Sequence, residues 1–202
     1  LGVRQADDSA FSSSSFCLSG GMVRNDVVTL LGGEGIECDL NGLVIGGGKQ
    51  HIDNHTRIHH ARANCNSREL YKAVLDDESH GVFNGKIYVA QDAQKTHAIQ
   101  TNQSLLLSPK AVMDTKPELE IYADDVKCTH GATVGQLNED GMFYLRSRGI
   151  DEETARVLLV YAFASDLVSG IELPPLREAV ERLLFDKLPG HCEPAGEAKG
   201  AC

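Results

Sequence analysis

Short apolar clusters separated by turn residues run along most of the chain, from Val27 to about residue 137. Most clusters alternate with polar residues, as in Lys86-Ile87-Tyr88-Val89 and Glu118-Leu119-Glu120-Ile121, and they recur roughly every 6 to 11 residues. A period of two is typical of strands that bury one face and expose the other. The pattern therefore predicts a succession of short β-strands.

The strands are not interrupted by helical segments longer than a couple of turns before residue 149. This excludes a doubly wound α/β fold, in which strands and helices alternate, and leaves a sandwich, a barrel or a solenoid. The sandwich is the commonest of these folds. Polar side chains within the predicted strands suit a solenoid, because stacked polar residues can pair between successive turns. They are His97, Gln100, Thr101, Asn102 and Gln103.

Helical periodicity begins after Gly149. Asp151 is a good N-cap, and apolar residues then follow at helical spacing from Ala155 to Leu167. Gly170 ends this helix, and Pro174-Pro175 begin another, with a second apolar stripe from Leu176 to Leu188. The sequence thus predicts two helices that form a C-terminal cap or a docking module.

The domain organisation predicted from these patterns has four parts. Residues 1–21 are Ser-rich and predict an irregular segment with one weak strand near Phe16. Residues 22–148 form the β core domain, and residues 149–190 form the helical domain. The last stretch, residues 191–202, predicts a polar tail.

The composition argues against some kinds of binding partner and indicates a cellular compartment. The chain has 202 residues and 21.8 kDa, with 19 Lys and Arg against 29 Asp and Glu, so its net charge is -10. An acidic chain is a poor ligand for nucleic acid or an anionic membrane. No apolar run approaches the roughly 18 residues of a membrane span, and no signal-peptide pattern opens the chain. The six cysteines have no C-x-x-C pair, so we expect reduced thiols in an intracellular compartment.

Two candidate motifs have simpler explanations. Gly46-Gly47-Gly48-Lys49 resembles a phosphate-binding loop, but Leu43 and Gln50 occupy positions where that motif needs Gly and Ser or Thr, so turns are predicted. The histidine-rich stretch from His51 to His60 would align metal ligands only on a helix. Its β-branched residues favour a strand with a polar outer face instead.

The sharper chemical candidate is Cys128-Thr129-His130. Residues i and i+2 of a strand point to the same side, with Cα atoms about 6.5–7 Å apart. A thiolate and an imidazole on one face can supply two ligands to iron or zinc, and a second chain would supply the others. The alternative is a structural cysteine beside a hydrogen-bonded histidine.

A chain of ordered motifs between His51 and Gly170 resembles the SufB/SufD family of the SUF iron–sulfur cluster assembly machinery. The clearest are the following: His51-Ile52-Asp53-Asn54-His55; Gly81-Val82-Phe83-Asn84-Gly85-Lys86-Ile87; Lys116-Pro117-Glu118-Leu119-Glu120-Ile121; Ala123-Asp124-Asp125-Val126-Lys127-Cys128-Thr129-His130-Gly131-Ala132; and Phe143-Tyr144-Leu145-Arg146-Ser147-Arg148-Gly149-Ile150. Gly131 stands where SufB-type chains typically carry Glu, so the chain resembles the SufD type.

The resemblance implies a right-handed parallel β-helix followed by a small C-terminal helical domain. It further implies a non-catalytic scaffold subunit that pairs with a SufB-type subunit and docks a SufC-type ATPase, in bacterial cytoplasm or plastid stroma. Cys128 and His130 would then face the SufB-type subunit as metal ligands for a transient iron–sulfur cluster or iron. The SufC-type contact would use Leu158, Leu159, Phe163, Leu176, Leu183 and Leu184, and a homodimer is a further possibility.

Family members are usually about twice this long, so the chain is expected to be a fragment. Two other functions are weighed against the scaffold: a left-handed β-helix acyltransferase and a metal-free β-solenoid interaction protein. The acyltransferase needs an aliphatic residue at every sixth position, but Ile45 is followed at that spacing by His51 and Arg57. Iron binding with and without a partner would separate the metal-free solenoid from the scaffold.

Overall fold

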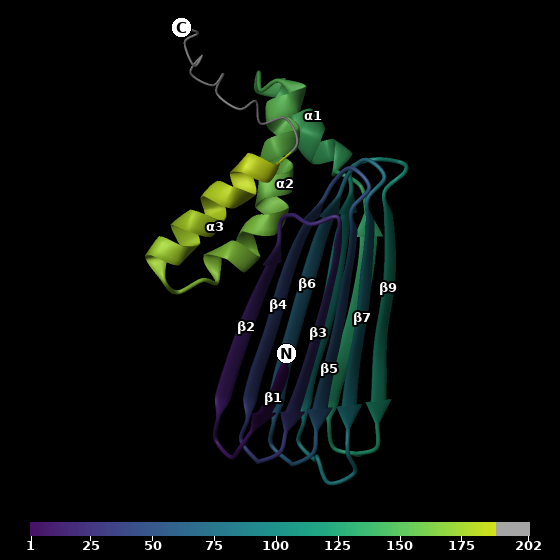
Figure 1. Cartoon of the computed structure of the whole chain (residues 1–202), viewed down its shortest axis with the longest axis vertical. Helices are drawn as coiled ribbons and strands as arrows, with labels where there is room; N and C mark the ends of the chain where they lie inside the picture. Colours follow the sequence, from purple (N-terminus) through teal and green to yellow (C-terminus); the bar gives the residue numbers. More distant parts are fainter. Residues whose placement is uncertain (189–202) are drawn as a thin grey trace, which may run out of the picture. The chain divides into compact units, whose positions relative to one another are not determined.

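A computed structural model of the protein describes residues 1–188 (Figure 1). Ten strands precede three helices. The strands are β1 (Gly2–Gln5), β2 (Ala10–Cys17), β3 (Met22–Leu31), β4 (Glu37–Gly46), β5 (His51–His60), β6 (Asn66–Leu75), β7 (His80–Val89), β8 (His97–Leu106), β9 (Val112–Ile121) and β10 (Lys127–Gly135). The helices are α1 (Glu139–Ser147), α2 (Glu152–Ser169) and α3 (Pro174–Lys187).

The strands form two parallel five-stranded sheets. One has the order β1-β3-β5-β7-β9 and the other β10-β8-β6-β4-β2, so successive strands alternate between the sheets (Figure 1). Residues paired on successive turns lie 26 to 32 positions apart, as with Gly2 and Val28, or His80 and Val112. This is a parallel β-solenoid of about five turns followed by small C-terminal helices, which confirms the predicted fold class.

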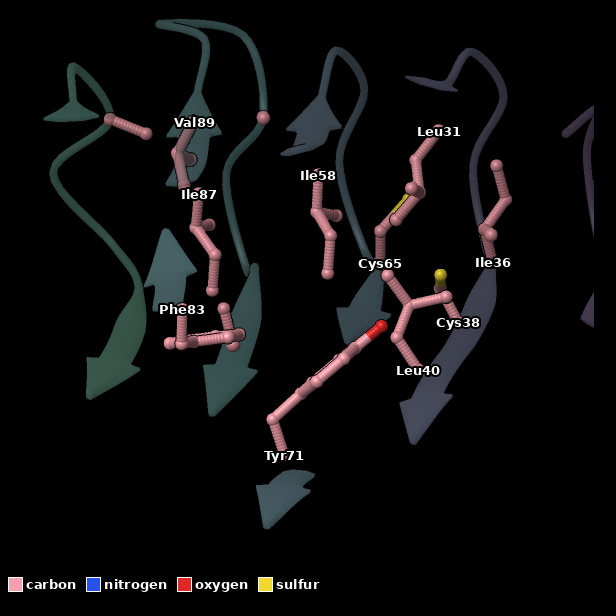
Figure 2. Close-up of a cluster of buried hydrophobic side chains, with 13 residues drawn as sticks. Leu31, Ile36, Cys38, Leu40, Ile58, Cys65, Tyr71, Phe83, Ile87 and Val89 are labelled. Carbon is pink, nitrogen blue, oxygen red and sulfur yellow. The ribbon is translucent and has the colours of Figure 1, made fainter. Parts of the chain in front are cut away.

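Alternation along each strand sends every second side chain into the space between the two sheets. Figure 2 shows the resulting core, in which Tyr71 and Phe83 lie 5.1 Å apart between ring centroids, with Leu40 and Ile58 nearby. Gly42 is required here, because a Cβ at that position would lie 2.2 Å from the Tyr71 ring. The four cysteines at positions 17, 38, 65 and 128 are free thiols, as predicted for the described part of the chain.

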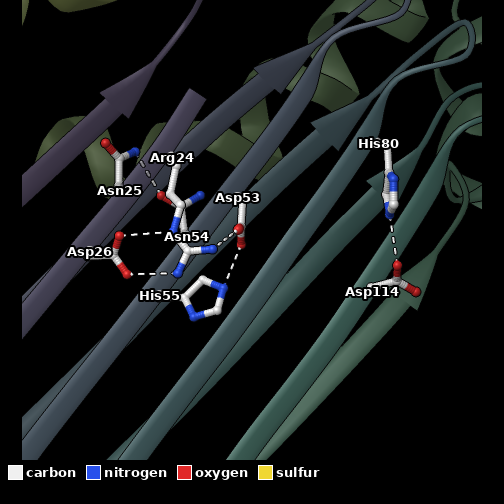
Figure 3. A network of polar contacts seen from close by, with 8 residues as sticks. All are labelled: Arg24, Asn25, Asp26, Asp53, Asn54, His55, His80 and Asp114. Carbon is white, nitrogen blue, oxygen red and sulfur yellow. Dashed lines mark hydrogen bonds and ion pairs between the residues drawn. The ribbon is translucent and has the colours of Figure 1, made fainter. Parts of the chain in front are cut away.

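The outer face of the first sheet is polar. On β5, His51, Asp53, His55, Arg57 and His59 point outward, as the strand interpretation of this stretch predicts, and Ile52 and Ile58 are buried. Polar contacts link the strands there: Arg24 Nη1 lies 2.7 Å from Asp53 Oδ2, and His80 Nε2 lies 2.7 Å from Asp114 Oδ2 (Figure 3).

Two predicted boundaries differ from the structure. Residues 1–21 are not irregular: β1 and β2 pair in register with β3 and β4, and the Ser side chains of β2 alternate between half-buried and exposed positions. The compact units divide after Gln136 rather than near residue 149, because α1 precedes the predicted boundary. This helix has only nine residues and no buried side chain, so it spans too few turns to stand out in the sequence.

The helical unit, residues 137–188, contains the two predicted helices. Asp151 caps α2 as predicted, its carboxylate accepting a hydrogen bond from the Thr154 backbone N–H at 2.9 Å. Pro174 begins α3. The rings of Tyr161 and Phe185 stack at 4.5 Å, which joins α2 to α3. The predicted polar tail, residues 191–202, lies outside the described residues.

Candidate functional site

The solenoid ends in two strands that are paired on one side only. Strand β9 pairs with β7 alone, and β10 pairs with β8 alone. Each therefore leaves one row of backbone N–H and C=O groups without a strand partner within residues 1–188. Apolar side chains accompany this open end: Val112 and Val134 are both about half exposed.

Both predicted metal ligands lie on β10 at this open end. Cys128 is in register with Ala98 and His130 with Gln100, and these two partners on β8 are fully buried. In-register neighbours in a parallel sheet point to the same face, so Cys128 and His130 share the inner face. Cys128 is half-buried against the core, whereas His130 is exposed because no further turn covers it.

The environment of Cys128 keeps its thiol protonated. Burial raises the pKa of the Cys128 thiol above its usual value, and a hydrogen bond with the Ala98 backbone only partly offsets this. The thiolate is the form that binds metals, so a metal must displace this proton on binding. Any metal ligation by this thiol would therefore release a proton, and the protonated thiol is a weak nucleophile.

A buried carboxyl group lies two strands behind His130. Glu69 on β6 is completely buried, and its Oε2 accepts a hydrogen bond of 2.6 Å from Gln100 Nε2. Burial raises the pKa of Glu69 to about 7. The sequence analysis missed this residue, although its spacing of two from the inward-facing Tyr71 was a usable signal.

The helical unit contains the six apolar residues expected to contact a partner. Leu158, Leu176 and Leu183 are exposed, and Leu159 and Phe163 are half-buried. Leu184 is completely buried, so it is a core residue of this unit rather than a contact residue. Among residues missed from the sequence, Phe143 on α1 is 75% exposed and lines an open cleft of about 580 Å³ with Met142.

Residues 1–188 contain neither a cluster of metal-binding side chains nor a membrane-spanning helix. No three or more His, Cys, Asp or Glu side chains are arranged there to hold a metal ion. None of the helices in the same range is long and apolar enough to cross a membrane.

The fold and this site define a class of protein: a two-sheet parallel β-solenoid whose open terminal turn carries a thiol and an imidazole, followed by a helical unit. The family model described as "SUF system FeS cluster assembly, SufBD core domain" matches residues 1–163. The chain therefore belongs to the SufBD family of SUF iron–sulfur cluster assembly proteins, and it is a SufD-type member.

Relatives from bacteria and a plant support this assignment. The chain is 43% identical over 185 residues to the iron-sulfur cluster assembly protein SufD of Escherichia coli. This match covers 92% of the chain and 44% of the relative. It is 37% identical to the chloroplastic protein ABCI7 of Arabidopsis thaliana, covering 87% of this chain and 37% of the relative. The iron-sulfur cluster assembly protein SufD of Bacillus subtilis is 33% identical, and the match covers 93% of this chain and 43% of that relative. The chain thus spans less than half the length of these relatives.

Proposed function

We propose that this chain is a scaffold subunit that pairs with a SufB-type subunit and docks a SufC-type ATPase, and that it has no catalytic activity alone. The observation that carries the proposal is the open terminal turn with Cys128 and His130 on its inner face. Bacterial cytoplasm or plastid stroma is the proposed compartment, in keeping with the bacterial and chloroplastic relatives.

The open end suits a partner that has a similar end. The unpaired backbone groups of β9 and β10 can add strands from another chain, which is the usual fate of long, uncovered edges. A SufB-type solenoid would supply two such strands. Val112 and Val134 would become buried between the two ends, which adds apolar area to the backbone hydrogen bonds.

The cluster is the cargo of this assembly rather than a resident cofactor. Cys128 would supply a thiolate and His130 an imidazole nitrogen to the iron of a nascent cluster, and both are suitable ligands for iron. The proton displaced from Cys128 would leave with metal binding. The remaining ligands would come from the partner subunit, so the cluster would form only in the paired state.

The SufC-type ATPase would dock on the helical unit. Exposed apolar side chains on α2 and α3 include Leu158, Leu176 and Leu183, and α1 adds Phe143. Half-buried Leu159 and Phe163 would border the contact. Exposed apolar residues that gather on helices are typical of surfaces that bind another protein.

The first test is co-expression of the chain with SufB-type and SufC-type subunits under anaerobic conditions, followed by light scattering of what co-purifies. We expect a stable complex that contains both partners. A lone monomer or a homodimer would contradict the proposal as a heteromeric scaffold, and a homodimer would support the self-association alternative instead.

The second test addresses the ligands within that complex. We expect His130→Ala and Cys128→Ser each to reduce the rate of cluster assembly at least about tenfold, measured by the visible absorbance of the cluster. Thr129→Ala is the matched control, because Thr129 lies between the two ligands and points to the outer face. Wild-type rates in both ligand variants would favour a metal-free interaction protein.

A further inference from the structure

A row of polar side chains runs along the inner face of the second sheet toward the open end. Glu69 on β6 is in register with Gln100 on β8, and Gln100 is in register with His130 on β10. Glu69 and Gln100 are completely buried, whereas His130 is exposed. Parallel neighbours lie about 4.8 Å apart. The three side chains therefore lie on neighbouring strands and lead from buried Glu69 to His130 at the open end.

The Gln100 amide is held in one orientation. Its Nε2 donates a hydrogen bond of 2.6 Å to Glu69 Oε2, toward the preceding turn. A Cβ built on Gly85 of the opposite sheet would lie 2.5 Å from the same nitrogen, so only glycine leaves room for the amide there. The amide oxygen, Oε1, takes no part in this hydrogen bond.

That oxygen is an acceptor without a partner. Within residues 1–188, Gln100 Oε1 is buried and makes no hydrogen bond. A buried acceptor that stays unpaired costs roughly 1–3 kcal/mol, so a donor on the next turn is favoured. On β10 the residue in register is His130, whose imidazole carries an N–H. Thr115 on β9 also has a buried hydroxyl without a hydrogen bond within residues 1–188.

We propose that Gln100, held by Glu69, is a positioning residue that accepts the imidazole N–H of His130 and thereby fixes its tautomer. This inference rests on the proposed role of His130 as a ligand. A hydrogen bond to one ring nitrogen leaves the other nitrogen unprotonated and directed at the metal. Glu69 acts through Gln100, because its carboxyl orients the amide and does not reach the imidazole.

The test reads the tautomer of His130 directly, in the full chain without metal. The protein is labelled with ¹⁵N in the histidine rings, and His130→Ala identifies the His130 signals by their loss. Spectra are recorded near pH 8.5, where an ordinary imidazole is neutral. In the wild type we expect one tautomer of His130 to dominate more strongly than either tautomer does at His97, which is exposed on the outer face of β8.

The variants separate positioning from packing. Gln100→Leu removes the acceptor and is expected to return His130 to the tautomer ratio of His97. The double variant Glu69→Leu with Gln100→Leu removes both buried polar groups and protects the fold, because paired polar groups can be replaced together at little cost. The double variant should also return His130 to the tautomer ratio of His97. Glu69→Gln keeps an oxygen that accepts the Gln100 N–H, so it should keep the wild-type tautomer.

Gln103→Leu is the matched control on the same strand, since Gln103 pairs with Thr133 on the outer face and should change nothing at His130. A His130 tautomer ratio that is the same in the wild type and both Gln100 variants would overturn the inference. That result would leave the ligand role of His130 open, which the cluster assembly rates of His130→Ala decide. The two failures are therefore distinguishable.

Discussion

The middle turns of the solenoid and its terminal turn have the same backbone and opposite properties. Strands β6 and β8 bury Glu69 and Gln100 completely, whereas β10, in register with them, leaves His130 exposed and Cys128 half-buried. The difference is the neighbour: β6 and β8 each have strands on both sides, and β10 has one. The same inward orientation thus produces a core residue in one turn and an accessible side chain in the next.

The comparison shows that the direction of a side chain and its solvent exposure depend on different features. Alternation along the strand determines which face a residue occupies. The number of neighbouring strands determines whether that face is exposed to solvent. Three measurements test whether the core and the exposed parts of the solenoid differ in stability as their burial indicates.

The largest effect is expected from truncating an aromatic ring in each region. Phe83 on β7 is 1% exposed, so Phe83→Ala should lower the free energy of unfolding by about 3–5 kcal/mol, because it leaves a cavity in the core. Tyr122, which follows β9, is 59% exposed, and Tyr122→Ala should cost less than about 1 kcal/mol. Urea denaturation measures both. Equal losses would mean that the terminal turn is packed as tightly as the middle.

The second effect concerns the pH dependence of stability. Glu69 has a pKa of about 7 when folded against 4.5 unfolded, so the folded state binds more protons between these values. The stabilisation is present below about pH 4.5 and is lost as the pH rises through 7. Relative to wild type, Glu69→Gln should therefore gain about 2 to 3 kcal/mol between pH 5 and pH 8.

The opposing contribution of His60 cancels in this comparison. Burial lowers the pKa of His60 to about 4, so its contribution to stability is lost as the pH falls from 6.5 toward 4, in both proteins alike. Urea titrations of the two proteins across the pH range give the difference directly. A constant difference would show that the pKa of Glu69 is not raised in the folded state.

The smallest effect is expected at an exposed ion pair between successive turns. Lys110 Nζ lies 3.0 Å from Glu78 Oε1, and both side chains are exposed. Lys110→Ala should change the free energy of unfolding by less than about 0.5 kcal/mol, because solvent and salt screen the pair. A double-mutant cycle with Glu78→Ala measures the coupling. A coupling energy above about 1 kcal/mol would mean that ion pairs between turns contribute to the free energy of unfolding on the scale of core contacts.

Much of the architecture follows from the sequence alone. Alternation in Lys86-Ile87-Tyr88-Val89 and its counterparts determined strands with one buried face, and the absence of long helical periods before residue 149 excluded α/β folds. Asp151 and Pro174 fixed where α2 and α3 begin, because capping and the fixed proline φ act locally. The spacing of Cys128 and His130 placed both on one strand face for the same local reason.

Other features depended on contacts distant in sequence. The Ser-rich stretch of β2 is a strand because β4, 27 residues on, pairs with it, as with Ala10 and Glu37. The burial of Glu69 and the hold it exerts on Gln100 need neighbours about 30 residues away. Only the tertiary structure decided that the stack ends at β10. That ending leaves His130 accessible, because a strand's exposure depends on how many neighbours it has.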